Sequence, residues 1–138
     1  MSLYDIALEI AINAHKNQFD KAGVDYIQHP LYVANLVSTD EEKCAALLHD
    51  VVEDSEYTLD DLTVKGIPQA VVTAVLILTK QQGVPYDDYL KKVKQNKIAR
   101  AVKLADLQHN SDLSRLSNIN EKDIKRQEKY KKAIEYLQ

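Results

Sequence analysis

The 138-residue chain has few residues that break or cross-link a polypeptide: three glycines, three prolines, one cysteine and no tryptophan. This scarcity disfavours a β fold of many short strands, because each connection between such strands needs a turn rich in glycine or proline. The single cysteine, Cys44, excludes an internal disulfide and any metal site built from several cysteines. Cys44 lies in an apolar run and is interpreted as a small buried hydrophobe.

Long apolar runs and blocks of like charge are also missing. No segment approaches the roughly 20 apolar residues that a membrane-spanning helix requires, and the N-terminus lacks a basic stretch followed by an apolar one. The formal net charge is −3 and the basic residues form no block, so neither nucleic acid nor a membrane is an expected partner. We expect a cytoplasmic enzyme or binding module.

The chain is rich in helix-forming residues arranged in amphipathic order. Apolar side chains recur three and four residues apart from Leu3 onward, which predicts a first helix of about four to five turns that ends near residues 20–23. Caps and prolines predict further helices that begin near residues 30, 40, 58, 68, 85, 98 and 121. The β-branched run at 71–78 also suits a strand, but its length favours a helix. The prediction is one all-α domain, a helical bundle over residues 1–138.

Ionisable residues interrupt the most apolar of these helices, in the segment LLHDVVED at 47–54. Buried carboxylates need partners, and one divalent cation satisfies several of them. At about 100° per residue, His49 and Asp50 flank a groove, while Glu53 lies between them one turn later and Asp54 faces the same way. This pattern predicts a hydrolytic centre in which Glu53 stands beside the attacking water.

Two ligands do not complete a metal site, and the sequence offers two more. His29 precedes Pro30 at a helix entry, and Asp106 lies on an apolar helix with Lys103 and Asn110 about one turn away on either side. Two imidazoles and two carboxylates suit Mn²⁺, Fe²⁺, Co²⁺ or Zn²⁺. Each feature alone has a plain structural interpretation, such as a chance His-Asp pair or a solvated acidic helix end. Their combination favours the metal site.

The remaining histidines and several tyrosines receive structural interpretations. His15 is interpreted as a packing residue or a neighbour of the ligands. His109 follows Asp106 by three residues, and its role stays open between packing and facing the substrate. Amphipathic helix packing is the interpretation for four tyrosines, namely Tyr86, Tyr89, Tyr130 and Tyr136.

The motifs resemble the HD-domain superfamily, in which a histidine, a His-Asp pair and a distant aspartate bind one metal ion. More narrowly, residues 11–116 are similar to the (p)ppGpp hydrolase domain of the RelA/SpoT homologues and to the small stand-alone alarmone hydrolases. The matching segments are AHxxQ at 14–18, GxxYIxHP at 23–30, ALLHDVVED at 46–54, TL at 58–59, LTK at 78–80 and VKLADxxHN at 102–110.

This resemblance implies an HD-type fold and a metal-dependent phosphohydrolase that releases pyrophosphate from the 3′ position of a guanosine polyphosphate. Glu53 and Asp54 would orient and deprotonate the attacking water. The implied ligands of one divalent ion, expected to be Mn²⁺, are His29, His49, Asp50 and Asp106. The residues expected to hold nucleotide or phosphate are Lys21, Tyr26, Lys103 and Asn110.

One position departs from the family pattern. The alarmone hydrolases carry an Arg-Lys pair beside the base, whereas this chain has Asp20 before Lys21. An arginine can stack on guanine, but an aspartate cannot and repels phosphate. A phosphohydrolase of another nucleotide or phosphoester is therefore an alternative. A second alternative is an inactive helical module that binds a nucleotide or a protein, although such a module needs no water-activating acid. The synthetase domain of the long homologues is expected to be absent.

Overall fold

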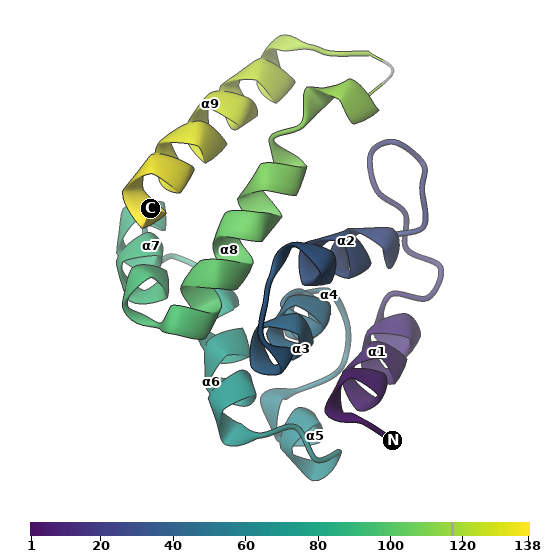
Figure 1. The fold of residues 1–138 in the computed structure, drawn as a ribbon. Helices are drawn as coiled ribbons and strands as arrows, with labels where there is room; N and C mark the ends of the chain where they lie inside the picture. Colours follow the sequence, from purple (N-terminus) through teal and green to yellow (C-terminus); the bar gives the residue numbers. More distant parts are fainter. Residues whose placement is uncertain (117) are drawn as a thin grey trace.

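The computed structural model describes residues 1–116 and 118–138, which form helices and no β-strand (Figure 1). A short 3₁₀ turn covers Leu113–Arg115. Among the described helices, none is both long and apolar enough to cross a membrane. The α-helices are α1 (Leu3–Ala14), α2 (Gln28–Leu36), α3 (Asp40–Leu48), α4 (Val51–Asp54), α5 (Leu59–Val64), α6 (Gln69–Leu78), α7 (Tyr86–Gln95), α8 (Lys97–Asn110) and α9 (Glu121–Leu137).

Helix α3 is the centre of the core. It packs against α1, α2, α6 and α8, and its residues from Cys44 to Leu48 are fully buried. Helix α9 packs along α8 and reaches α7 at its C-terminal end (Figure 1). The predicted all-α class and the burial of Cys44 are confirmed.

Local capping explains most helix starts. Thr39, rather than the predicted Asp40, caps α3: its side chain accepts from the Glu42 N–H, and the Glu42 carboxylate accepts from the Thr39 N–H. Pro68 and Pro85 directly precede α6 and α7. The β-branched run at 71–78 is therefore helical, as predicted.

The first helix is shorter than predicted, because α1 ends at Ala14. The Gln18 side chain donates to the Ala14 carbonyl, which is the acceptor that the Gln18 backbone N–H would use in a continuing helix. The Gln18 N–H bonds to the His15 carbonyl instead, and Asn17 adopts a φ of 66°. A loop then runs to α2.

The sequence pattern had suggested one continuous apolar helix around the His-Asp pair, but the helix is broken there. His49 is the C-cap of α3, and Asp50 precedes the separate short helix α4. The His49 Nδ1 lies 2.5 Å from the Ala46 carbonyl oxygen, and it competes there with the Asp50 N–H that a continuous helix would pair with that oxygen. The break places His49 and Asp50 at a chain bend.

Candidate functional site

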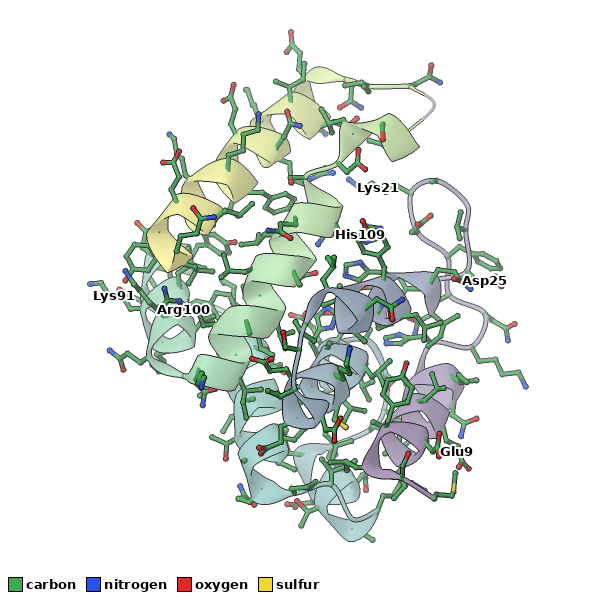
Figure 2. The ribbon with its side chains drawn as sticks, viewed as in Figure 1. Glu9, Lys21, Asp25, Lys91, Arg100 and His109 are labelled. Carbon is green, nitrogen blue, oxygen red and sulfur yellow. The ribbon has the colours of Figure 1, made fainter. Side chains whose placement is uncertain are left out.

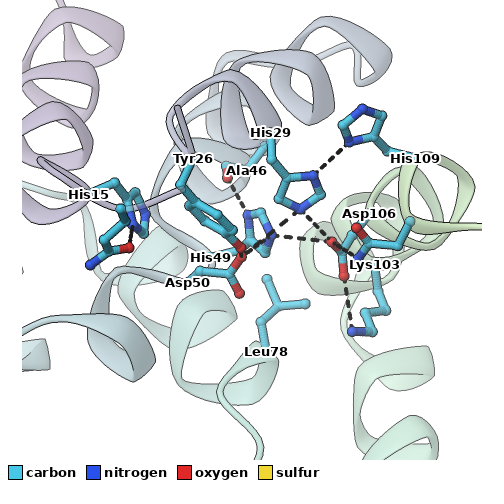
Figure 3. Close-up of polar contacts among 12 residues, drawn as sticks. His15, Tyr26, His29, Ala46, His49, Asp50, Leu78, Lys103, Asp106 and His109 are labelled. Atoms are coloured by element: carbon cyan, nitrogen blue, oxygen red, sulfur yellow. Dashed lines mark hydrogen bonds and ion pairs between the residues drawn. The ribbon is translucent and has the colours of Figure 1, made fainter. Parts of the chain in front are cut away.

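Two imidazoles and two carboxylates from distant parts of the chain meet at one point (Figure 3). His29 lies in the first turn of α2, His49 and Asp50 at the bend after α3, and Asp106 on α8. The His29 Nε2 is 2.8 Å from the Asp106 Oδ1, and the His49 Nε2 is 3.0 Å from the Asp50 Oδ2. The structure therefore brings the four predicted ligands together.

The donor set fits a divalent cation. One ligand atom each from His29, His49 and Asp50 lies within 4.8 Å of the others, and Asp106 Oδ1 is 3.4 Å from the His49 Nε2. The His49 Nδ1 must carry the proton, since it donates to the Ala46 carbonyl. The buried His49 Nε2 makes no hydrogen bond among the described residues, although it lies 3.0 Å from the Asp50 Oδ2 and 3.4 Å from the Asp106 Oδ1. A cation would satisfy all three groups.

His109 contacts the candidate ligand His29 and supports its orientation. The two Nδ1 atoms are 2.7 Å apart, and the His109 ring stacks on Tyr32 at 4.1 Å between ring centroids. One ring donates and the other accepts, which holds the His29 Nε2 toward Asp106 (Figure 3). His109 is buried and lies next to the candidate ligand His29. Its position three residues after Asp106 was the sequence signal for this role.

Replacing His109 with phenylalanine is expected to weaken Mn²⁺ binding by about 10- to 100-fold, because it keeps the stack on Tyr32 but removes the partner of His29. Isothermal titration with MnCl₂ measures this change. The matched control is Tyr4→Phe, on α1, which should bind Mn²⁺ like the wild type. Unchanged affinity in His109→Phe would show that the His29 orientation does not depend on this contact.

Three of the four predicted substrate residues contact the carboxylates of the candidate ligands Asp50 and Asp106. The Tyr26 hydroxyl donates to Asp50, Lys103 Nζ is 3.0 Å from the Asp106 Oδ2, and Asn110 Nδ2 is 3.0 Å from the Asp106 Oδ1. Burial alone would raise the pKa of Asp106, but Lys103 and the imidazoles outweigh it and hold this pKa well below its usual range. The carboxylate stays ionised and ready to ligate a cation.

His15 lies outside the candidate ligand cluster and packs against Tyr26. Its ring centroid is 4.8 Å from that of Tyr26, and its Nδ1 is 2.9 Å from the Gln18 side-chain oxygen. Gln18 also donates to the backbone carbonyl of Asp54 at 2.9 Å. This chain of contacts links the loop after α1 to the end of α4.

Of the two predicted water-activating acids, Glu53 lines the pocket beside the ligands. This pocket, of about 180 Å³, is lined by His49, Asp50, Glu53 and Lys103 among others. Glu53 is exposed overall, but partial burial of its carboxyl group, followed by the negative charges of Asp50 and Asp54, raises its pKa. Burial and Asp50 likewise raise the pKa of Asp54, which is not among the residues that line the pocket.

A larger cleft, of about 370 Å³, contains the other predicted substrate positions Lys21, Tyr26 and Asn110. Tyr26 and Asn110 also bond to the ligand carboxylates, so the cleft reaches the candidate metal centre. Figure 2 shows Lys21 between its loop and the C-terminal end of α8. The far wall includes Arg126 and Tyr130 from α9. Sequence reasoning missed Arg126 because α9 lies beyond the matching motifs.

The structure gives Asp20 a local role. Its Oδ1 accepts from the backbone N–H groups of Ala22 and Val24, at 2.9 and 3.0 Å. These bonds close the turn that contains Gly23, whose φ of 81° favours glycine. Asp20 therefore stabilises the loop that carries Lys21, which accounts for an aspartate at this position.

Known proteins resemble the chain in both sequence and fold. The HD domain family model matches residues 7–135. A guanosine-3′,5′-bis(diphosphate) 3′-pyrophosphohydrolase of Danio rerio is 35% identical over 128 residues, which cover 78% of this chain and 67% of that protein. A protein of Haemophilus influenzae with the same enzyme name is 46% identical over 57 residues, 38% of this chain and 8% of that protein. The chain thus spans a small part of the length of the first curated relatives.

A solved structure of a metazoan orthologue of SpoT that hydrolyses ppGpp has a TM-score of 0.81 to this chain at 21% identity. The match covers 99% of this chain and 85% of that one, so the two share a fold. The family match extends over most of the chain and includes every residue of the candidate metal centre. The chain therefore belongs to the HD-domain family.

Proposed function

We propose that this protein is a metal-dependent phosphohydrolase that removes the 3′-diphosphate of a guanosine polyphosphate such as ppGpp. The observation that carries the proposal is the convergence of two imidazoles and two carboxylates beside the acid Glu53. The names of the Danio rerio and Haemophilus influenzae relatives support this substrate. The proposed ligands of one divalent ion, Mn²⁺, are His29, His49, Asp50 and Asp106.

The ion, when bound, would polarise the phosphoryl group and lower the pKa of water. Glu53 would accept a proton from the attacking water, with Asp54 assisting through its charge. The water oxygen forms a bond to the phosphorus attached to the ribose 3′-oxygen. The bond between that phosphorus and the 3′-oxygen breaks, and the 3′-oxygen takes up a proton. Lys103 would offset negative charge on the phosphate oxygens.

The test is an assay of purified protein with MnCl₂ against ppGpp, pppGpp and common nucleotides, with products separated by ion chromatography. Pyrophosphate and GDP from ppGpp would support the proposal. Orthophosphate from a nucleoside monophosphate would favour the second candidate, a phosphohydrolase of another nucleotide, which the aspartate at position 20 motivates. A protein that retains no metal and hydrolyses nothing would instead be a binding module.

The basic side chains of the cleft, Lys21 and Arg126, are expected to bind the nucleotide without taking part in the chemical step. Lys21→Ala and Arg126→Ala should each raise KM for ppGpp by about 5- to 20-fold, with kcat little changed, since each removes one charged contact from a partly exposed site. Steady-state kinetics measure both constants. Lys16→Ala, an exposed lysine outside the cleft, is the control. A drop in kcat at constant KM would contradict the assignment.

A further inference from the structure

The hydroxyl of Tyr86 is not explained by packing. It is buried and has no hydrogen-bond partner among the described residues. The ring does pack, as predicted: it lies 5.8 Å from the Tyr89 ring, with Lys129 Nζ 4.1 Å above its centroid. Because a buried hydroxyl without a partner lowers stability, a phenylalanine would serve packing better. The hydroxyl therefore calls for a functional explanation.

The neighbouring tyrosine on α7 provides a direct comparison. Tyr89 lies three residues later and lines the same pocket as Tyr86, but its hydroxyl donates to the Leu78 carbonyl at 2.7 Å. Within the described part of the chain, one of these two nearby tyrosine hydroxyls therefore has a hydrogen-bond partner and the other has none. The unpaired one belongs to the residue at the start of α7, directly after Pro85.

The surroundings of Tyr86 indicate the chemistry of its missing partner. Of the two pockets that Tyr86 lines, the one beside the candidate metal centre also contains Lys80, Lys103, the acid Glu53 and the candidate ligands His49 and Asp50. Leu78 and Lys103 lie beside this centre in Figure 3. Lys103 is close enough to oppose the increase that burial causes in the Tyr86 pKa. A hydroxyl donor together with two ammonium groups is a set that binds phosphate oxygens.

The pocket and the cleft beside the candidate ligands differ in volume and lining, as the diphosphate and nucleoside ends of a nucleotide do. The pocket that Tyr86 shares with His49 and Asp50 is about 180 Å³, whereas the cleft that holds Lys21, Tyr26 and Asn110 is about 370 Å³. The cleft has apolar and aromatic walls that include Phe19, whose side chain is 63% exposed. The smaller pocket suits a diphosphate, and the larger cleft suits a nucleoside.

We propose that Tyr86 is a substrate-contacting residue whose hydroxyl donates a hydrogen bond to the diphosphate leaving group, in a site completed by Lys80 and Lys103. This inference rests on the proposed function for the identity of the leaving group. The hydroxyl gains its partner only when the anion is bound. The unpaired hydroxyl of the free protein therefore contributes to catalysis at the expense of stability.

The test compares Tyr86→Phe with Tyr89→Phe and Tyr136→Phe. Tyr86→Phe should keep or raise Tm, because it removes an unpaired buried hydroxyl, and should lower kcat for ppGpp by about 10- to 100-fold. Titration of the Mn²⁺-loaded protein should show weaker binding of inorganic pyrophosphate, by about 5-fold or more, with GDP binding unchanged. Tyr89→Phe should lower Tm because the Leu78 carbonyl loses its donor. Tyr136→Phe, on the exposed face of α9, should match the wild type.

Two results would overturn the inference. One is wild-type kcat and pyrophosphate affinity in Tyr86→Phe. The other is a lower Tm with equal losses of pyrophosphate and GDP binding, which would make Tyr86 a packing residue. Failure of the proposed function is distinguishable: a wild type that binds pyrophosphate through Tyr86 but leaves ppGpp intact would uphold the anion contact and reject the alarmone substrate.

Discussion

The Glu53→Gln protein should bind Mn²⁺ like the wild type and hydrolyse ppGpp about 10²- to 10⁴-fold more slowly. Glutamine has nearly the same shape as glutamate but cannot accept a proton from water. Glu53 lines the pocket beside His49 and Asp50, yet it is exposed and lies outside the group of His29, His49 and Asp50 whose ligand atoms converge. The expected loss is therefore in kcat, and the ion should remain bound. Single-turnover kinetics and Mn²⁺ titration separate the two effects.

The matched control for this variant is Glu56→Gln. Glu56 is also exposed, three residues further along the chain, and does not line the pocket. Its replacement should leave kcat, KM and metal affinity at wild-type values. A Glu53→Gln enzyme with wild-type turnover would exclude Glu53 as the base and make Asp54, the second acid of the pair, the next residue to test.

Replacing Asp50 with alanine should abolish both metal binding and turnover. Asp50 supplies an oxygen 3.0 Å from the His49 Nε2 and is held there by Tyr26. Loss of a charged ligand should weaken Mn²⁺ binding by more than about 100-fold, since loss of a mere neighbour of a ligand costs about 10- to 100-fold. Asp50→Asn refines the test, because it keeps an acceptor for Tyr26 and removes only the charge.

Metal content and thermal unfolding provide two independent measurements of this effect. Wild-type protein with Mn²⁺ at 100 times its Kd should be stabilised by about 2.7 kcal/mol, because the ion binds only the folded chain. Asp50→Ala and Asp50→Asn should show no such stabilisation. Asp60→Ala, an exposed aspartate on α5, should respond like the wild type. An Asp50→Asn protein that still gains stability from Mn²⁺ would remove Asp50 from the ligand set.

Helix positions were largely predictable from the sequence because they depend on neighbours in the chain. Apolar spacing and the prolines at 68 and 85 identified α6 and α7. Thr58 caps α5, as its spacing to Asp61 suggested, and α9 begins directly after Asn120, as predicted. The errors at the ends of α1 and α3 arose where a side chain takes over a backbone hydrogen bond. Gln18 does so at the end of α1, and His49 does so at the bend between α3 and α4.

The candidate metal ligands were also predictable, because ionisable residues in apolar helices need partners wherever the chain folds. Other parts of the site depend on which helices lie beside one another. The contact between His29 and His109 joins residues 80 positions apart, and Arg126 reaches the cleft only because α9 packs along α8.

The sequence by itself determined the helical class, the family motifs and the residues able to bind a metal, since composition and spacing are local properties of the chain. Tertiary structure alone decided that the His29 Nε2 faces Asp106 and that the Tyr86 hydroxyl has no hydrogen-bond partner among the described residues. A hydrogen bond depends on distance and direction between atoms. Those quantities exist only once the helices have packed.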